Sequence, residues 1–255
     1  MSKKPRAYLS EIFSSIQGEG LYVGARQVFL RFAGCNLSCS YCDTPASQSS
    51  RPEACGVQDR PESLEMTSVA NPLDVETVAA HVTRMESAAP GHHSISLTGG
   101  EPLMQAGFLR ELCPELRRLE TLIFLESNGT LVKAIEDLLP NMDIVAMDYK
   151  LESAAGVKPD ADLHRNFLRV AAGKEVFVKA VVDASTRDEE IEECAGVVAV
   201  VDRHIPLVIQ PVTPVAGKPA TPPSGLRLAQ LQRLASRFVG DVRVIPQCHK
   251  LLGLP

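Results

Sequence analysis

The sequence predicts an α/β fold in which most strands of the central sheet are parallel. Short apolar runs alternate with segments of helical periodicity between residues 73 and 245. Strands that alternate with helices in this way form parallel sheets with right-handed crossovers. The chain has 255 residues and is 45% hydrophobic, which is enough for one substantial core. We therefore expect a single domain over residues 1–255, with loop elaborations.

Composition and charge argue against several classes of function. The formal net charge is −5 and the sequence pI is near 5.7, with no basic block, so a nucleic-acid-binding surface is not expected. The basic residues before Ala7 lead into a polar stretch rather than an apolar one, so they do not form a signal peptide. No run approaches the length of a membrane span. These features predict a cytoplasmic protein that acts on a small molecule, without nucleic-acid or membrane partners.

The first elements predict a strand, a turn and a second strand. Residues 6–14 form the first strand, which leads to the turn at residues 15–20. Glycines let the backbone of this turn approach a ligand closely, although a plain surface turn has the same composition. Residues 27–33 read as a buried strand in which Arg31 is the one cation. A buried arginine needs an anionic partner, and the residues alone favour an internal carboxylate over a substrate carboxylate.

Three of the seven cysteines, Cys35, Cys39 and Cys42, lie within eight residues in the pattern CxxxCxxC. Disulfides are not expected in a cytoplasmic protein, so the thiolates need a cation. A structural zinc site requires four ligands, and Cys55 is already thirteen residues further on. A cluster of four irons held by three cysteines leaves one iron open to a substrate or cofactor. A zinc knuckle or chance clustering is the alternative.

Residues 45–71 predict a long loop or insertion, because they are rich in Ser, Pro, Glu and Gln and lack periodicity. In a compact domain such a segment often forms a lid. Cys55, within it, is expected to be a free thiol. A helix follows from residue 75, with Asp74 as its N-cap.

Polar residues gather where the later strands are expected to end. The strand at 93–98 stops at the tetrapeptide 99–102, Gly-Gly-Glu-Pro. Further strands are expected at 122–127, 143–147, 175–182, 206–209 and 242–245, with helices at 104–119, 131–139, 186–201 and 226–238. The polar residues at strand ends are Thr98, Glu126, Asn128, Asp148, Lys150, Lys179 and Gln210. Each could singly be a helix cap or a surface residue, but together they predict a ligand site on the C-terminal face of the sheet.

The cysteine spacing, with Tyr41 just before the last cysteine, resembles the cluster loop of the radical S-adenosylmethionine (SAM) superfamily. The tetrapeptide 99–102 resembles the superfamily's contact with the SAM amino group. This resemblance implies a partial, open TIM-like barrel of the radical SAM type, a 4Fe–4S cluster, and SAM bound to the open iron. One electron from the cluster would cleave SAM to a 5′-deoxyadenosyl radical. The resemblance implies a cluster on Cys35, Cys39 and Cys42, and SAM contacts from Tyr41, Cys42, Asp43, Gly99, Gly100, Glu101, Asn128, Lys150 and Gln210.

Within the superfamily, segments across almost the whole chain resemble the 7-carboxy-7-deazaguanine synthases. They are residues 16–20, 29–32, 34–44, 98–102, 126–130 and 246–253. The resemblance implies a carbon–nitrogen lyase of deazapurine (queuosine) biosynthesis that converts 6-carboxy-5,6,7,8-tetrahydropterin to 7-carboxy-7-deazaguanine with loss of ammonia. It also implies Mg²⁺ on Thr44, a reductant such as flavodoxin or ferredoxin, and a homodimer. The substrate contacts expected on this basis are Ile16, Gln17, Gly18, Glu19, Arg31 and Thr98.

The chain end predicts one further substrate contact. Leu251, Leu252 and Leu254 are apolar and follow a strand, so this tail is expected to dock over the substrate pocket. We expect the carboxylate of Pro255 to accept hydrogen bonds from the pterin's amino and ring N–H groups.

One departure from the family pattern bears on the SAM site. Many family members carry Ser-Pro-Lys where this chain has Asp148-Tyr149-Lys150. An Asp-x-Lys resembles the glycyl-radical enzyme activases, which are the second enzymatic interpretation. An electron-carrying iron–sulfur module without a SAM pocket is the non-enzymatic alternative.

Overall fold

The computed structural model describes residues 4–63, 65–214 and 220–254, and its centre is one open sheet of ten strands. The strand order is β12-β11-β10-β9-β8-β7-β3-β2-β4-β5. All neighbours from β3 to β12 are parallel, whereas β2 is antiparallel to β3. The strands are β2 (Leu9–Ile16), β3 (Arg26–Phe32), β4 (Ala54–Gln58), β5 (Met66–Ala70), β7 (Ser94–Gly99), β8 (Leu122–Ser127), β9 (Ile144–Asp148), β10 (Glu175–Val182), β11 (Leu207–Pro211) and β12 (Val242–Val244). The predicted open parallel barrel is confirmed.

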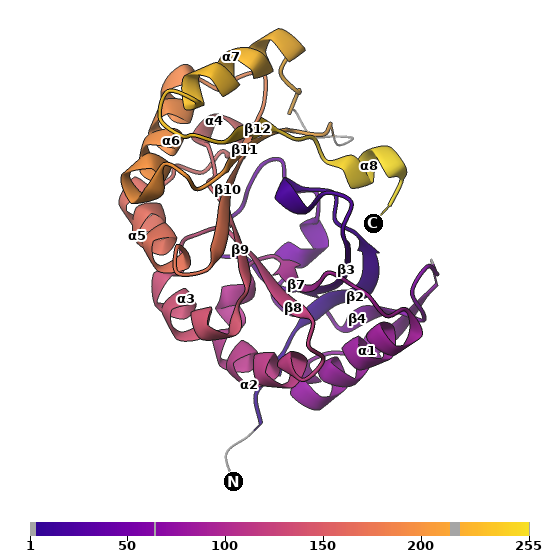
Figure 1. Ribbon diagram of the computed structural model, residues 1–255. Helices are drawn as coiled ribbons and strands as arrows, with labels where there is room; N and C mark the ends of the chain where they lie inside the picture. The colour runs from indigo at the N-terminus through magenta and orange to yellow at the C-terminus, as the bar shows by residue number, and fades with distance from the viewer. Residues whose placement is uncertain (1–3, 64, 215–219, 255) are drawn as a thin grey trace.

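Helices cover the outer face of the curved sheet, as Figure 1 shows, and the short strands β1 (Arg6–Ala7) and β6 (Leu73–Asp74) pair beside it. The side chain of Asp74 accepts a hydrogen bond from the backbone N–H of Thr77 at 2.9 Å, which confirms the predicted N-cap of α1. No helix in the described part of the chain has the length and apolar character that crossing a membrane requires. The helices are α1 (Val75–Ala88), α2 (Ala106–Arg117), α3 (Val132–Leu138), α4 (Glu152–Ala155), α5 (Ala161–Ala171), α6 (Asp188–Asp202), α7 (Gly225–Ala235) and α8 (Cys248–Leu252).

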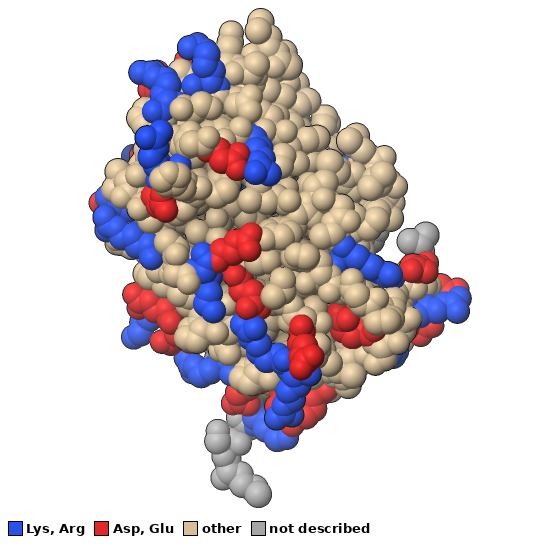
Figure 2. Space-filling model, in the orientation of Figure 1, with Lys and Arg blue, Asp and Glu red and all other residues tan. Residues whose placement is uncertain are grey.

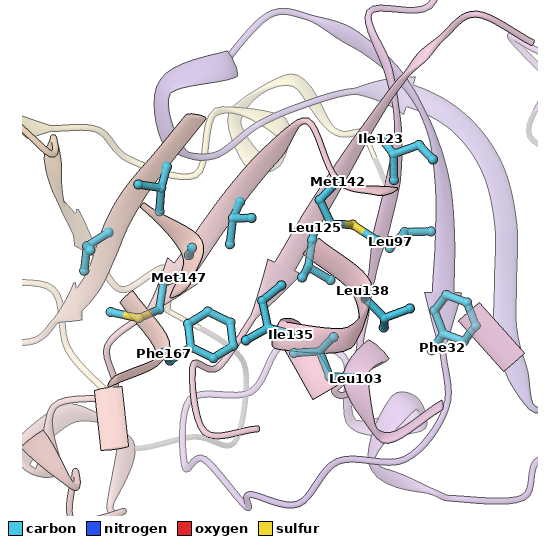
Figure 3. Packing of buried hydrophobic residues seen from close by; sticks show 14 of the residues in the cluster. Phe32, Leu97, Leu103, Ile123, Leu125, Ile135, Leu138, Met142, Met147 and Phe167 are labelled. Carbon is cyan, nitrogen blue, oxygen red and sulfur yellow. The ribbon is translucent and has the colours of Figure 1, made fainter. Parts of the chain in front are cut away.

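The main core lies between the sheet and these outer helices. Figure 3 shows Leu125 and Met147 of the sheet packed toward Ile135 of α3 and Phe167 of α5. Each is fully buried, and removing such a side chain from water contributes about 1.5–3 kcal/mol. This packing fixes the strand ends that carry the polar residues.

The opposite face of the strands carries a second, smaller apolar cluster. Neighbouring residues of a strand point to opposite faces, so Phe124 and Ala146 face away from the main core. They are joined by Phe177 of β10, and the ring of Tyr22 packs on Phe124 at a centroid distance of 5.7 Å. This cluster fills the inner face near the middle of the strands, which leaves the carboxyl ends for a pocket.

The prediction of an irregular loop at residues 45–71 is wrong over residues 54–58 and 66–70, which form strands. Strands β4 and β5 form an antiparallel hairpin there, and β4 adds in parallel to β2. Only Cys55 and Val57 of β4 bring apolar side chains to the core, so the composition gave little sign of strands. The side chain of Gln58 ties the hairpin to the sheet by accepting from the backbone N–H of Ser14 at 2.8 Å.

Charged side chains of both signs are interspersed on the surface. Figure 2 shows Lys and Arg beside Asp and Glu on the face that it displays. Several are paired, such as Arg110 with Asp137 at 3.0 Å and Arg117 with Asp143 at 2.9 Å. Exposed pairs of this kind contribute little to stability, but they reduce the net potential of the surface.

Candidate active site at the carboxyl ends of the strands

One pocket at the carboxyl ends of the parallel strands brings together nearly all the sequence-predicted site residues. Two predicted residues are not in it: Glu101 does not line the pocket, and Pro255 lies outside the described residues. The prediction for Pro255 therefore stays a prediction. The predicted residues that line the pocket are Ile16, Gln17, Gly18, Glu19, Arg31, Cys35, Cys39, Tyr41, Cys42, Asp43, Thr44, Thr98, Gly99, Gly100, Asn128, Lys150 and Gln210.

The cysteine loop, residues 34–44, packs against Gly99, which ends β7, and Gly100, which follows it. The backbone N–H of Gly100 donates to the Phe32 carbonyl at 2.9 Å, and that of Glu101 donates to the Gly34 carbonyl at 2.8 Å. A Cβ at residue 100 would overlap the Gly34 carbonyl, so only glycine permits this approach. Gly99 has a φ of +118°, which other residues rarely adopt. The glycine pair therefore fixes the place of the cysteine loop relative to the sheet.

The three thiols of the loop lie close together on one wall of the pocket. Burial raises the pKa of Cys35 and of Cys39, and negative charge on the neighbouring thiols raises both further. Three thiolates in this setting need a cation to offset their charge, and a soft donor set of this kind suits iron. The residues therefore fit an iron–sulfur cluster. Cys55, Cys113 and Cys194 are buried elsewhere and do not line the pocket.

Three buried polar atoms in the pocket wall have no hydrogen-bond partner among the described residues. One is Oδ1 of Asp148, which still faces the Lys179 ammonium at 3.2 Å. The other two are the hydroxyl of Tyr41 and Oε1 of Gln210. Buried polar atoms of this kind are nearly always paired in folded proteins. Both residues were predicted to contact SAM, and their unpaired atoms fit a polar ligand such as SAM.

Glu101 lies behind the pocket wall rather than in it. Its carboxylate is fully buried and accepts hydrogen bonds from the backbone N–H groups of Leu103 at 3.1 Å and Asn128 at 2.8 Å. The hydroxyl of Ser127 donates to it at 3.0 Å. Burial raises the pKa of Glu101 to about 7, although these donors oppose the shift. Glu101 therefore joins the ends of β7 and β8 from outside the pocket lining, and its predicted contact with SAM stays a prediction.

Asp148 is shared by two lysines of the pocket. The ammonium of Lys150 donates to Asp148 Oδ2 at 2.9 Å, and that of Lys179 lies 3.2 Å from Asp148 Oδ1. Lys150 also lies 5.5 Å from the ring centroid of Tyr41. Burial alone would lower the pKa of Lys150, but Asp148, Tyr41 and Cys39 together outweigh burial and the pKa is raised, so the ammonium persists beside the cysteine loop.

In the same pocket, Glu126 organises two of the residues predicted to bind the pterin. Gln17 donates to Glu126 Oε1 at 2.9 Å, and Thr98 donates to Glu126 Oε2 at 3.1 Å. Burial raises the pKa of Glu126. The sequence placed Glu126 among the polar strand ends but did not assign it to the site. The array presents carboxylate, amide and hydroxyl groups to one region of the pocket.

Arg31 lines the pocket and also has an internal partner. Its Nε donates to Glu11 Oε2 at 2.6 Å, and its guanidinium lies 5.4 Å from the ring centroid of Phe13. The side chain of Arg31 is 16% exposed. The internal carboxylate favoured by the residues alone is therefore present.

Three potential metal ligands lie near one another in the pocket that Thr44, the predicted magnesium ligand, also lines. Glu19, Asp43 and His249 bring one ligand atom each within 4.8 Å of one another. Thr44 Oγ1 lies 3.8 Å from Cys42 Sγ. Oxygen-rich surroundings suit a small divalent cation.

Residues near the chain end complete the pocket. Gln247, His249 and Lys250 line it, and sequence reasoning assigned none of them to the site. Figure 1 shows α8 set apart from the outer helices, on the side of β2 and β3. Residues 246–253 contributed to the family resemblance, which was the one signal that could have identified them.

Comparisons with known proteins show the family of this chain. The radical SAM superfamily pattern matches residues 30–181. A 7-carboxy-7-deazaguanine synthase of Geobacter sulfurreducens is 41% identical over 251 residues, with 98% of each chain covered. A 7-carboxy-7-deazaguanine synthase of Methanothermobacter thermautotrophicus is 36% identical over 272 residues, with the same coverage.

Solved structures share the fold at low identity. QueE from Escherichia coli has a TM-score of 0.60 and 19% identity, covering 96% of this chain and 95% of its own. A radical SAM methyltransferase from Sphaerobacter thermophilus has a TM-score of 0.61 and 16% identity, covering 87% of this chain and 66% of its own. Neither the activase nor the electron-transfer interpretation is favoured by these relatives. The chain belongs to the radical SAM superfamily and, within it, to the family of the 7-carboxy-7-deazaguanine synthases.

Proposed function

We propose that this protein converts 6-carboxy-5,6,7,8-tetrahydropterin to 7-carboxy-7-deazaguanine and ammonia in deazapurine (queuosine) biosynthesis. The observation that carries the proposal is a single pocket lined both by three thiols and by the Gln17–Glu126–Thr98 array. The enzyme is a carbon–nitrogen lyase in this scheme. The product differs from the substrate by one molecule of ammonia, so no net oxidant is required.

Cys35, Cys39 and Cys42 would hold a 4Fe–4S cluster, and Tyr41, Asn128, Lys150 and Gln210 would contact SAM. When bound, the cluster and SAM together would supply the radical that takes a hydrogen atom from C6 of the pterin and later returns it. The unpaired Tyr41 hydroxyl and Gln210 Oε1 offer a donor and an acceptor to SAM. The Lys150 ammonium offers a positive charge to the carboxylate of SAM.

Other residues of the pocket would orient the pterin. Gln17 and Thr98 are fixed by Glu126 and present polar groups to the edge of the ring. Arg31 uses Nε for Glu11, which leaves its terminal nitrogens on the pocket side for a substrate carboxylate. A fixed orientation brings the reacting carbon toward the radical and lowers the entropic barrier.

Magnesium, partners and location complete the proposal. Thr44 would bind Mg²⁺ through its hydroxyl, with substrate oxygens and water as further ligands. A flavodoxin or ferredoxin would supply electrons, and the enzyme would act as a cytoplasmic homodimer.

An anaerobic assay tests the proposed function. The reconstituted protein is incubated with SAM, a reductant, Mg²⁺ and the carboxypterin, and the deazaguanine and ammonia are measured. We expect product in equal amounts with ammonia and no net consumption of SAM. Reductive cleavage of SAM without any ring-contracted product would contradict the assigned substrate while retaining the radical SAM chemistry.

A further inference from the structure

One side-chain amide joins the chain end to two carboxylates on different walls of the pocket. Nε2 of Gln247 donates to Glu19 Oε1 at 2.6 Å and to Asp43 Oδ2 at 3.2 Å. Glu19 belongs to the turn that follows β2, whereas Asp43 directly follows the cluster cysteine Cys42. A primary amide carries two hydrogens, so one side chain can serve both carboxylates at once.

Each acceptor also lies beside a cation, which for Asp43 faces the same oxygen that accepts from Gln247. Glu19 forms an ion pair with Lys179, and Asp43 lies 3.4 Å from the ammonium of Lys250. Burial alone would raise the pKa of Glu19, but Lys179 and the hydrogen bond from Gln247 lower it to about 2. Hydrogen bonds to ionised acceptors are stronger than those between neutral groups, so the bridge resists opening.

The segment that carries Gln247 is itself attached to the turn after β2. The backbone N–H of Cys248 donates to the Gly18 carbonyl at 2.8 Å. A Cβ at residue 18 would overlap the imidazole of His249, so the two segments touch without an intervening side chain. A displacement of the turn therefore displaces Gln247, and Gln247 in turn bears on Asp43.

We propose that Gln247 is a positioning residue that couples the pterin end of the pocket to the cofactor end. The inference rests on the proposed function, because it assigns the pterin to the turn and SAM to the cysteine loop. A pterin that orders the turn fixes Gln247 and, through it, Asp43 and the loop. Coupling between two sites is reciprocal, so SAM must tighten pterin binding by the same factor.

The test measures the dissociation constant of SAM with and without saturating carboxypterin, anaerobically, on the cluster-loaded protein. The change in the electron paramagnetic resonance spectrum of the reduced cluster reports SAM binding independently of turnover. We expect the pterin to tighten SAM binding about tenfold in the parent protein, which corresponds to about 1.4 kcal/mol. In Gln247→Leu we expect a factor near one.

A matched control distinguishes the loss of the Gln247 bridge from the loss of any side-chain amide that donates a hydrogen bond. Nε2 of Gln232 donates to the Val242 carbonyl at 2.8 Å and lies outside the pocket, so Gln232→Leu should keep the tenfold coupling. Gln247→Asn keeps an amide but is one methylene shorter, so it cannot reach both carboxylates and should also lose most of the coupling. It replaces Gln247→Leu if the leucine variant does not load its cluster.

The outcomes distinguish the inference from the proposed function. Retained tenfold coupling in Gln247→Leu or Gln247→Asn would overturn the inference alone. A parent protein that binds SAM but not the carboxypterin would overturn the proposed substrate, and the inference with it. Coupling lost in the Gln247 variants and kept in Gln232→Leu supports both.

Discussion

The carboxylate of Glu101 accepts a hydrogen bond from the backbone N–H of Asn128 at 2.8 Å, which links the strand end that seats the cysteine loop to the next strand end. Asn128 lines the pocket and Glu101 does not. The acidic residue of the Gly-Gly-Glu-Pro motif thus acts on the pocket from behind, through the backbone of its neighbour.

Glu101 should make the stability of the protein depend on pH. Burial raises the pKa of Glu101 from 4.5 to about 7, so the folded state binds this proton more tightly than the unfolded chain. The resulting contribution to the free energy of unfolding is complete below about pH 4.5 and is lost as the pH rises through 7. This contribution is on the order of 3 kcal/mol. Glu101→Gln removes the titration. We expect the melting temperature of the parent, relative to Glu101→Gln, to fall between pH 5 and pH 8. Parallel curves for the two proteins would contradict this assignment.

Arg31 should affect substrate binding more than its ion-pair partner does. Arg31→Lys keeps the charge but loses the planar fork, so we expect pterin binding to weaken by on the order of 1–3 kcal/mol. Glu11→Gln is the matched control, since it removes the internal partner and leaves the guanidinium in the pocket wall. Titration calorimetry with the carboxypterin measures both. If the two variants lose the same stability and neither loses affinity, Arg31 has only the structural role.

Each cysteine of the loop should be required for the cluster. Cys35→Ser, Cys39→Ser and Cys42→Ser each remove one strong thiolate ligand, and we expect loss of the brown absorption after anaerobic reconstitution and at least a thousandfold loss of turnover, on the order of 4 kcal/mol. Cys248→Ser is the control, because Cys248 does not line the pocket. Full activity in Cys35→Ser would contradict the assigned cluster.

Gly100→Ala should displace the cysteine loop. The added methyl group would overlap the Gly34 carbonyl, which is backbone and cannot swing away. We expect destabilisation on the order of 2 kcal/mol and weaker cluster loading, measured by thermal unfolding and iron content. Gly107→Ala in α2 is the matched control, since nothing lies within 4 Å of its added Cβ, and a helix favours alanine over glycine by about 1 kcal/mol. Equal iron content in Gly100→Ala and Gly107→Ala would argue against a role of Gly100 in positioning the cysteine loop.

Thr44 should link activity to magnesium. Thr44→Val has the same shape without the hydroxyl, so we expect its turnover to fall and to lose its response to added Mg²⁺. Metal-chelated protein titrated with Mg²⁺ provides the measurement. Parent activity that a chelator leaves unchanged would count against a magnesium role for Thr44.

Much of the site could be predicted from local sequence. The cysteine spacing fixes which thiols meet, and the glycine pair after β7 fixes what can approach them, because both depend on a few adjacent residues. Strand ends in a parallel sheet share one edge, so the polar residues there could also be brought together from the sequence.

The remaining features depend on information that local sequence does not carry. A glutamate in a motif can point toward either side of the chain, and only the packing around Glu101 shows that it faces inward. Strand β4 buries only a few side chains and β5 has no fully buried residue, so their composition resembles that of a loop. Gln247 and Asp43 are separated by 204 residues, and no local pattern pairs them.

The separation of Gln247 and Asp43 in the sequence also has a consequence for the synthesis of the polypeptide chain. On the ribosome, Asp43 is synthesised 204 residues before the glutamine that later bridges it to Glu19. At about 5–20 residues per second, the nascent chain carries the three thiols for roughly ten to forty seconds before that bridge can form. Throughout this interval, Gln247 cannot yet tie Asp43 and the cysteine loop to Glu19.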